Sequence, residues 1–364
     1  MGSMKSITWL PTHPAMGWVS MNRCWNALEQ QRLSAPPDDL QIKCPLALES
    51  VEQPGLGRMR RAWKRSVEYP LLVRSRPATD VYHVLDHSFA DLLCWLPGRA
   101  KSIVTVHDVI PLLEPYGMST AQQRRFRKRV SCVRRADRVI CVSEFTRRTL
   151  LQEFDMEPAK VCVLANGAEF SMAPDADEPN PFPQTSGIKL LMVGSVLRRK
   201  NLRVIPPLIR ELRRRGREVC LLRVGQKLPH EMAEEVRAAL GSAGRLLESG
   251  LVPDQALQAA YSSADALLFP STLEGFGLPI LEAMAAGCPV VTSNAASLPE
   301  VGGDAVLYFS PHDAGQAAEA CVRLMTEPGL REMLVRKGRE RAAQYTWANH
   351  WKKLCDIYRE VANA

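Results

Sequence analysis

Short apolar segments alternate with longer segments of helical pattern along the whole chain, and this alternation limits the possible folds more than any other feature. The apolar residues in the short segments are continuous, which is typical of parallel strands covered on both faces. The repeated strand–helix order therefore predicts an α/β fold with doubly wound parallel sheets. The expected strands cover residues 81–85, 102–107, 138–143, 161–165, 188–193, 219–224, 266–269, 289–292 and 306–309.

A proline-rich segment divides these elements into two groups. Residues 174–187 contain four prolines and several turn formers, as interdomain linkers do. We expect one Rossmann-like domain over residues 1–173, another over residues 188–346 and an amphipathic helix over residues 347–364. The length of 364 residues suits two domains that each bury a core. The cleft between two facing domains is the expected ligand site.

The composition excludes several classes of protein. Hydrophobic residues make up 46% and charged residues 24% of the chain, as in ordinary globular proteins and unlike disordered ones. No apolar stretch is long enough to cross a bilayer, and no signal peptide follows the start, so we expect a cytoplasmic protein. The ten cysteines form no CxxC pair and are expected to be free thiols.

The strongest candidate site begins where the expected strand 266–269 ends. Gly275 and Gly277 let the backbone turn tightly and approach a ligand closely. Pro279 suits the first turn of a helix expected over residues 278–286. A strand-to-helix turn of this kind directs free N–H groups and the positive end of a helix dipole at a ligand, and it therefore favours an anion.

Two carboxylates accompany this turn. Glu274 lies in the loop, and Glu282 lies eight positions later between Leu281 and Ala283. An unpaired carboxylate in an apolar helix is costly, so Glu282 needs a polar partner. The hydroxyl groups of a ribose are one good candidate.

A second candidate site follows the expected strand 188–193. The strand ends near Gly194, and the basic pair Arg199 and Lys200 stands just before a helix. An arginine binds phosphate oxygens as a planar fork and a lysine binds them as a point charge. Beside the first turn, this pair could hold a diphosphate.

These segments resemble a known family, the retaining nucleotide-sugar glycosyltransferases of glycosyltransferase family 4, which have the GT-B fold. The resemblance covers nearly the whole chain. It rests in the second half on "VGSVLRRKN", "SGLVPDQALQAAYSSADALLFPS", "EGFGLPILEAMAAGCPVV" and "SLPEVGGDAVLYFSPHD", and in the first half on "VTVHDVIPL", "VICVSEFTRRTL" and "LANGAEF".

The resemblance implies a role for each matching residue. Arg199 and Lys200 would hold the donor diphosphate, and Glu282 the ribose. His107 would lie near the transferred sugar, with Asp108 orienting the loop or the ring. Glu274 and the backbone of the next four residues, Gly275, Phe276, Gly277 and Leu278, would hold the sugar and its phosphate. The backbone of Leu251 and Val252 would contact the base. Gly194 and Gly17 would also approach the phosphates. Many members of the family have two glycines near the position of Gly17, where this chain has one.

The family also implies a reaction. A hexose would leave a nucleotide diphosphate with retention of configuration, by front-face transfer, onto a saccharide or lipid-linked oligosaccharide. Similarity of "HDVIPL" and "SLPEVGGDAVLYF" to bacterial polysaccharide mannosyltransferases favours GDP-mannose, with UDP-glucose or UDP-N-acetylglucosamine as the alternative. Donors aimed at the diphosphate would stabilise the leaving group without a metal or other cofactor. The pair Asp175 and Asp177 has the spelling of a metal motif but lies in the linker. The C-terminal helix would pack back on the N-terminal domain, the acceptor-binding half.

Two basic blocks stand apart from these motifs. Residues 58–76 contain seven basic residues and one acid, and residues 124–138 contain eight and one. They are either solvated helix faces or a surface for the anionic inner leaflet of the membrane, with Trp63 and Phe126 at the interface. No nucleic-acid motif accompanies them, so nucleic acid is not an expected partner. A nucleotide-sugar epimerase or a non-catalytic relative remains the alternative on the same fold.

Overall fold

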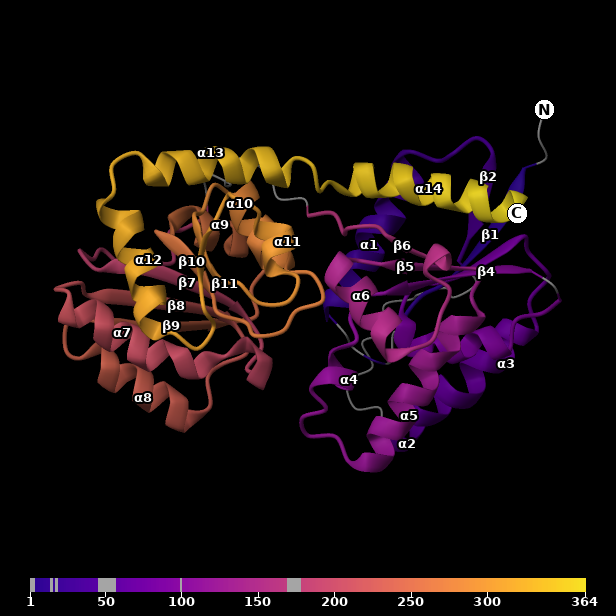
Figure 1. The fold of residues 1–364 in the computed structure, drawn as a ribbon, viewed down its shortest axis with the longest axis horizontal. Helices are drawn as coiled ribbons and strands as arrows, with labels where there is room; N and C mark the ends of the chain where they lie inside the picture. The colour runs from indigo at the N-terminus through magenta and orange to yellow at the C-terminus, as the bar shows by residue number, and fades with distance from the viewer. Residues whose placement is uncertain (1–3, 14–15, 17–18, 45–56, 99, 169–177) are drawn as a thin grey trace. The chain divides into compact units, whose positions relative to one another are not determined.

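The computed structural model describes residues 4–13, 16, 19–44, 57–98, 100–168 and 178–364, and the chain in it divides into two compact units. The first unit consists of residues up to Gly167 together with Trp347–Ala364, and the second of Ala168–Thr346. Gly17, Asp175 and Asp177, which the sequence singles out, lie outside the described residues. Each unit contains one parallel six-stranded sheet, and the α/β fold predicted from the alternation is confirmed (Figure 1).

The sheet of the first unit has the strand order β2-β1-β3-β4-β5-β6. Its strands are β1 (Lys5–Leu10), β2 (Leu40–Lys43), β3 (Val81–Val84), β4 (Lys101–Val106), β5 (Arg138–Cys141) and β6 (Val161–Val163). Its α-helices are α1 (Val19–Ser34), α2 (Arg58–Trp63), α3 (Tyr69–Arg74), α4 (Ile110–Leu113), α5 (Thr120–Val130), α6 (Glu144–Glu153) and α14 (Trp347–Asn363). A π turn (Lys64–Glu68) joins α2 to α3, and 3₁₀ segments occupy His87–Cys94, Ser131–Arg135 and Pro158–Lys160.

The sheet of the second unit has the order β12-β11-β10-β7-β8-β9. Its strands are β7 (Ile188–Gly194), β8 (Val219–Gly225), β9 (Arg245–Gly250), β10 (Ala266–Phe269), β11 (Val290–Ser293) and β12 (Leu307–Phe309). Its α-helices are α7 (Ile205–Arg214), α8 (His230–Leu240), α9 (Asp254–Ser263), α10 (Leu278–Ala285), α11 (Leu298–Gly302), α12 (Ala314–Thr326) and α13 (Leu330–Ala342). Short 3₁₀ turns at Arg198–Lys200 and Leu202–Val204 precede α7.

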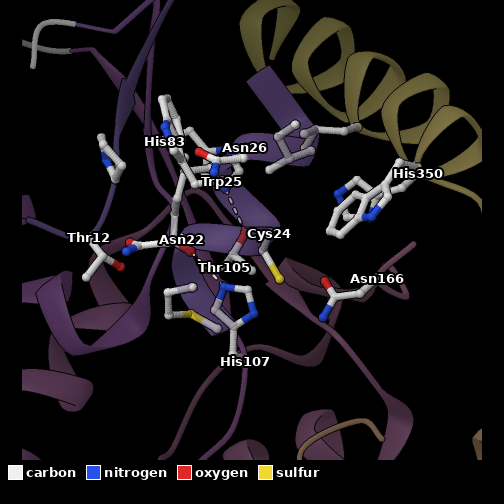
Figure 2. Close-up of a pocket in the computed structure, with 16 residues that line it drawn as sticks. Thr12, Asn22, Cys24, Trp25, Asn26, His83, Thr105, His107, Asn166 and His350 are labelled. Carbon is white, nitrogen blue, oxygen red and sulfur yellow. Dashed lines mark hydrogen bonds between the residues drawn. The ribbon is translucent and has the colours of Figure 1, made fainter. Parts of the chain in front are cut away.

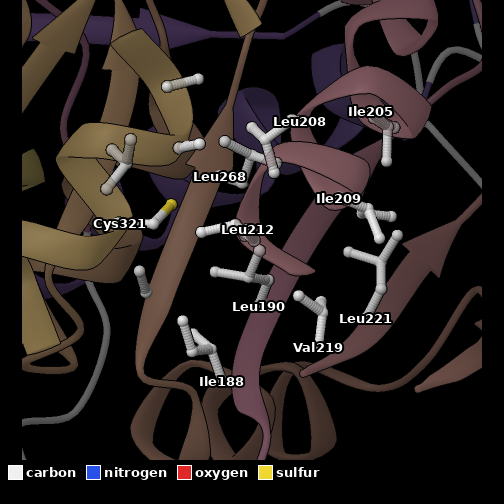
Figure 3. Close-up of a cluster of buried hydrophobic side chains, with 14 of the residues drawn as sticks. Ile188, Leu190, Ile205, Leu208, Ile209, Leu212, Val219, Leu221, Leu268 and Cys321 are labelled. Carbon is white, nitrogen blue, oxygen red and sulfur yellow. The ribbon is translucent and has the colours of Figure 1, made fainter. Parts of the chain in front are cut away.

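The core of the second unit shows why the strands read as continuous apolar runs. Leu190 of β7 and Leu221 of β8 are fully buried and pack with Leu208 and Leu212 of α7 and with Cys321 of α12 (Figure 3). Both faces of a doubly wound sheet are covered by helices, so residues on both faces of its central strands are apolar.

The last helix in the chain belongs to the core of the first unit. Trp9 of β1 is fully buried, and its indole ring makes edge-to-face contacts with Trp25 of α1 and with Trp351 of α14. Trp9 Nε1 also donates a 2.7 Å hydrogen bond to the hydroxyl of Tyr358. The 347–363 helix therefore fills part of the first unit's interior, as the amphipathic pattern of its sequence allows.

Candidate functional site

The second unit has its topological switch point between β7 and β10. These two strands are neighbours in the sheet, yet the chain continues from β7 toward β8 on one side and from β10 toward β11 on the other. Loops that leave such a pair diverge and open a crevice at the carboxyl ends of the strands, which is where α/β proteins bind ligands. The two loops are the segments that carry Arg199 and Lys200 after β7, and Glu274 after β10.

Two glycines shape the end of β7. Gly194 and Gly225 are paired in the register of β7 and β8, and both have positive φ, at 129° and 114°. A Cβ atom on Gly225 would lie 2.4 Å from the carbonyl oxygen of Gly194. A Cβ atom on Gly194 would lie 3.6 Å from Nζ of Lys200, so the glycine keeps this side of the lysine open. The predicted Gly194 therefore stands beside the predicted basic pair.

The structure brings three of the four residues predicted as catalytic into direct contact. Nζ of Lys200 donates to Oε1 of Glu274 at 2.6 Å, and Nη1 of Arg199 donates to Oε2 of the same carboxylate at 2.5 Å. The Arg199 guanidinium also reaches the carbonyl oxygen of Leu273 at 3.2 Å. The Lys200 ammonium lies 4.8 Å from the ring centre of Phe269, a cation–π contact.

The charges of this cluster leave a positive excess. Burial alone would raise the pKa of Glu274, but the nearby Lys200 and Arg199 outweigh burial and hold it below its usual range. The carboxylate is therefore ionised at neutral pH, and two cations face one anion. The remaining single positive charge can be neutralised by a further anionic group, such as a phosphate.

The glycine turn before α10 is fixed by hydrogen bonds that the sequence motif does not reveal. The hydroxyl of Ser297 shares its one hydrogen between the carbonyl oxygens of Glu274 and Phe276, at 2.9 and 2.7 Å. Gly277 has φ of 119° and immediately precedes α10, which begins at Leu278. Gly275 and Phe276 are buried. Because the carbonyl groups of this loop are bonded to Ser297, the loop holds one backbone conformation at the start of the helix.

Glu282 has a partner within the protein. Its carboxylate is buried on α10 and accepts a 2.8 Å hydrogen bond from the hydroxyl of Tyr261 on α9. The expectation that a buried Glu282 needs a polar partner is thus met in part by Tyr261. Its role toward a ribose stays a prediction.

The residues predicted to contact the base follow β9. The side chain of Leu251 is 79% exposed, and Val252 is half-buried. Both lie at the carboxyl edge of the same sheet as Gly194, since β9 is parallel to β8 and β8 to β7.

His107, the fourth residue predicted as catalytic, belongs to the first unit. It directly follows β4, and its Nε2 lies 2.9 Å from the carbonyl oxygen of Leu85, which follows β3. Asp108 accepts a hydrogen bond from the backbone N–H of Ile110 at 3.0 Å. That carboxylate therefore orders the loop after β4, while Leu85 orients the imidazole.

Two further residues organise the second unit's site without having been singled out by the motifs. Arg223 of β8 is 2% exposed and donates to the carbonyl oxygens of Gly194, Ser195 and Gln226. Asn201 has φ of 53°, and its amide donates to the carbonyl oxygens of Pro270 and Pro311. For Arg223 the sequence contains one signal, which is the presence of an arginine inside the apolar run of β8. A charge in a central strand indicates buried carbonyl groups that need a donor.

No group of three or more histidine, cysteine, aspartate or glutamate side chains that could hold a metal occurs among the described residues. Within the same part of the chain, no helix has the length and apolar character that crossing a membrane requires.

Comparison with known proteins finds a matching family model for most of each unit. The family model described as Glycosyltransferase Family 4 matches residues 32–171, and that described as Glycosyl transferases group 1 matches residues 175–341. The O-antigen chain mannosyltransferase B of Escherichia coli is 27% identical over 300 residues, which are 80% of this chain and 79% of that protein.

Solved structures support the same architecture. The sucrose-phosphate synthase of Thermosynechococcus elongatus superposes with a TM-score of 0.73 at 19% identity and covers 98% of both chains. The Anabaena protein Alr3699/HepE, solved in complex with UDP and glucose, has a TM-score of 0.68 at 15% identity over 98% of this chain and 99% of its own. At these identities the likeness concerns the fold, which is the GT-B fold of two Rossmann-like domains.

Proposed function

We propose that this chain, which belongs to the glycosyltransferases with a Glycosyltransferase Family 4 domain followed by a group 1 domain, transfers a hexose from GDP-mannose to a saccharide or lipid-linked oligosaccharide. The observation that carries the proposal is the pair of cations, Arg199 and Lys200, on the carboxylate of Glu274 at the switch point. The likeness to the O-antigen chain mannosyltransferase B supports mannose as the sugar. A UDP-sugar is the alternative, supported by the fold relative solved with UDP and glucose.

The chemistry follows from where charge develops. Breaking the bond between the sugar and the diphosphate leaves negative charge on the phosphate and positive charge on the sugar ring. Arg199 and Lys200 would stabilise the departing phosphate, and fixed donors of this kind lower a barrier by several kcal/mol. The N–H groups at the start of α10 would add to that stabilisation. We propose that the reaction is a front-face transfer, which retains the configuration at the anomeric carbon of the sugar. We also propose that side-chain cations supply the positive charge that a metal would otherwise provide.

A panel of nucleotides tests the donor. The melting temperature of the full chain is measured with GDP, UDP, ADP and CMP, first in EDTA and then with magnesium. A nucleotide at about 100 times its Kd should stabilise the chain by about 2.7 kcal/mol. We expect GDP to raise the melting temperature in EDTA, and Lys200→Met to abolish that rise while Arg203→Ala, an exposed neighbour, preserves it. A shift with none of the four would contradict the proposal.

A product assay tests the stereochemistry. After transfer from GDP-mannose, whose sugar is α-linked, the one-bond carbon–hydrogen coupling at the anomeric carbon of the product distinguishes an α from a β linkage. Retention predicts an α linkage, and a β product would overturn the front-face mechanism.

The acceptor-side surface carries a feature that favours an anionic membrane as partner. Along α2, the π turn and α3, the side chains of Met59, Trp63, Val67 and Leu71 are 40–87% exposed. They are spaced four residues apart, which keeps them on one helical face. Arg60, Arg61 and Arg74 on the same segment are exposed. An apolar ridge flanked by arginines is the arrangement that inserts into the headgroup region of anionic bilayers.

The second basic block comes near the first at one point. Burial and the nearby guanidinium of Arg65 lower the pKa of Arg129 of α5, so a residue of each block lies close to the other. Sedimentation with vesicles of phosphatidylglycerol and phosphatidylcholine tests this surface. We expect binding at low salt that falls with salt, is weaker with phosphatidylcholine alone and is reduced by Trp63→Ala. The matched control is Trp95→Ala, since Trp95 is also exposed but lies outside the ridge. Equal binding of both variants would exclude insertion of the ridge.

A further inference from the structure

Two free cysteines of the first unit lie side by side at its surface, and the proposed reaction uses neither of them. Cys94 ends the 3₁₀ segment His87–Cys94, and Cys132 belongs to the 3₁₀ segment Ser131–Arg135 that follows α5. These two segments pack against each other. Cys94 is exposed and Cys132 is half-buried, so a small reagent can reach the pair from solvent.

The sulfur of Cys94 has a cation beside it. Nη1 of Arg135 donates a hydrogen bond to Sγ of Cys94 at 2.9 Å. The thiolate is the form of cysteine that attacks an oxidant, and a neighbouring guanidinium stabilises negative charge on the sulfur. Cys94 therefore combines the two properties of oxidant-sensitive cysteines, which are access to solvent and an adjacent positive charge.

Cys132 is held next to Cys94 as a protonated thiol. Its Sγ donates to the carbonyl oxygen of Lys128, one turn earlier, at 3.5 Å. Burial raises the pKa of Cys132 to about 11, and the charge of Cys94, a hydrogen bond between the two side chains and the charge of Asp91 raise it further against Arg135. Once Cys94 is oxidised and uncharged, its contribution disappears. Cys132 is therefore the second sulfur to react and not the first.

Three other cysteines of the first unit show the contrast. Cys141 of β5 and Cys162 of β6 lie on neighbouring strands, but the register pairs Cys162 with Ile140, so the two cysteine side chains point to opposite faces of the sheet. Cys24 is buried on α1 and lines a pocket whose other described lining residues include no cysteine (Figure 2). An oxidant should therefore select Cys94 and Cys132 over these three.

We propose that Cys94 and Cys132 are a reversible modification site, which hydrogen peroxide closes to a disulfide and a dithiol reopens. The Cys94 thiolate attacks one peroxide oxygen, the O–O bond breaks, and a sulfenic acid and hydroxide result. The Cys132 sulfur then attacks the Cys94 sulfur, the S–O bond breaks, and the hydroxyl group leaves with the thiol proton as water. The bridge ties together the two ends of residues 94–132, which contain β4, the His107 loop and the basic helix α5.

Peptide mass spectrometry of the folded full chain tests the site after hydrogen peroxide, alkylation of the remaining thiols and digestion. We expect the Cys94–Cys132 bridge to form before any other and dithiothreitol to remove it. With dimedone, which traps sulfenic acids, Cys132→Ser should accumulate the adduct on Cys94, and Cys94→Ser should give no adduct on Cys132. Cys162→Ser removes a half-buried cysteine outside the pair and should keep the bridge. Melting temperatures within a few degrees of the parent show that the variants fold.

A second comparison tests the role of the guanidinium. Arg135→Gln should slow formation of the dimedone adduct on Cys94 at least threefold, whereas Arg134→Gln, at the exposed neighbouring position, should leave the rate unchanged. A mixture of bridges no more selective than that formed in concentrated urea would overturn the inference. So would a bridge that forms only between chains, or an adduct that forms on Cys132 and not on Cys94. None of these results depends on which nucleotide the chain binds, so they leave the proposed function untouched.

Discussion

Lys200 and Glu274 stand 74 positions apart in the chain, and their side chains meet at 2.6 Å, Nζ to Oε1. The contact depends on the switch-point topology, because the loops that carry them follow β7 and β10, which are sheet neighbours. With Arg199 on the other carboxylate oxygen, the cluster has two cations for one anion. Its charge balance leads to a prediction that separates binding from catalysis.

Replacing Glu274 by glutamine should uncouple nucleotide binding from transfer. The neutral side chain raises the net charge of the cluster by one unit, so free GDP should bind more tightly and raise the melting temperature further. Loss of the fixed contact to both cations should slow transfer by about 10²-fold or more, the scale on which one preorganised charge acts. Nucleotide release and thermal shifts measure the two effects. Glu319→Gln, an exposed ion-pair partner of Arg215, is the matched control, and a parallel loss of both quantities would contradict the separation.

Replacing Arg223 by methionine should destabilise the second unit. The guanidinium is buried and is the donor to the carbonyl groups of Gly194, Ser195 and Gln226, which would be left without it. These acceptors belong to half-buried Gly194 and Ser195 and to exposed Gln226, and the Gly194 carbonyl keeps its bond from the Gln226 N–H, so we expect a loss of about 1–3 kcal/mol. Chemical denaturation measures it. Arg245→Met, on the exposed edge strand β9, should change stability by less than about 0.5 kcal/mol.

Two glycines of similar backbone conformation should respond differently to alanine. Gly225→Ala places a Cβ atom 2.4 Å from the carbonyl oxygen of Gly194, at φ of 114°. Gly216 has φ of 73° and nothing within 4 Å of its ideal Cβ position. The strain of positive φ costs about 1 kcal/mol at Gly216, and the clash at Gly225 should add at least about 2 kcal/mol more. Equal losses would show that the β7–β8 pair accommodates a methyl group.

Stability should fall as pH decreases from neutral. The pKa of His83 is lowered from 6.5 to about 3 and that of His350 to about 4, in both cases first by burial. The unfolded chain therefore binds more protons below pH 6.5, and the stabilising contribution present above pH 6.5 is lost as pH falls toward the folded-state values. At about 1.4 kcal/mol per pH unit, each histidine contributes a loss of about 2 kcal/mol at pH 5.

Denaturation between pH 7.5 and 5 measures this slope. His83→Gln should reduce the slope of stability against pH by the contribution of one histidine. His230→Gln, at an exposed position of α8, should leave that slope unchanged. A slope that His83→Gln leaves unchanged would place the responsible groups elsewhere.

The fold class and most of the strands could be predicted from the sequence, but three strands could not. The expected strands agree with the observed ones to within two residues. Three observed strands, β1, β2 and β9, were not among them. The strands β2 and β9 are edge strands in which polar residues interrupt the apolar run, and β1 is a central strand whose first two residues are Lys5 and Ser6. Lys43 of β2 and Glu248 of β9 are examples of such polar residues, which an edge strand tolerates because one of its edges faces solvent.

The site could be predicted where a residue's own chemistry indicated a ligand. The neighbourhood of Arg199 and Glu274 followed from the glycine turns and the parallel sheet. The contacts of Ser297 with the glycine loop, and of Asn201 with Pro311, join segments far apart in sequence and leave no local pattern. The second-unit helix α9 likewise gave no sign that Tyr261 would meet Glu282.

The place of α14 in the first unit has a consequence during synthesis on the ribosome. Residues 168–346 leave the exit tunnel as a contiguous unit and contain every strand of their sheet. The first unit, although its six strands emerge earlier, lacks Trp351 and Tyr358 against Trp9 until the 347–363 segment is translated. The interior of the first unit therefore stays incompletely packed while the second unit is synthesised and folds. A chaperone that shields apolar surface during translation should engage the N-terminal half for longer than its position in the chain suggests.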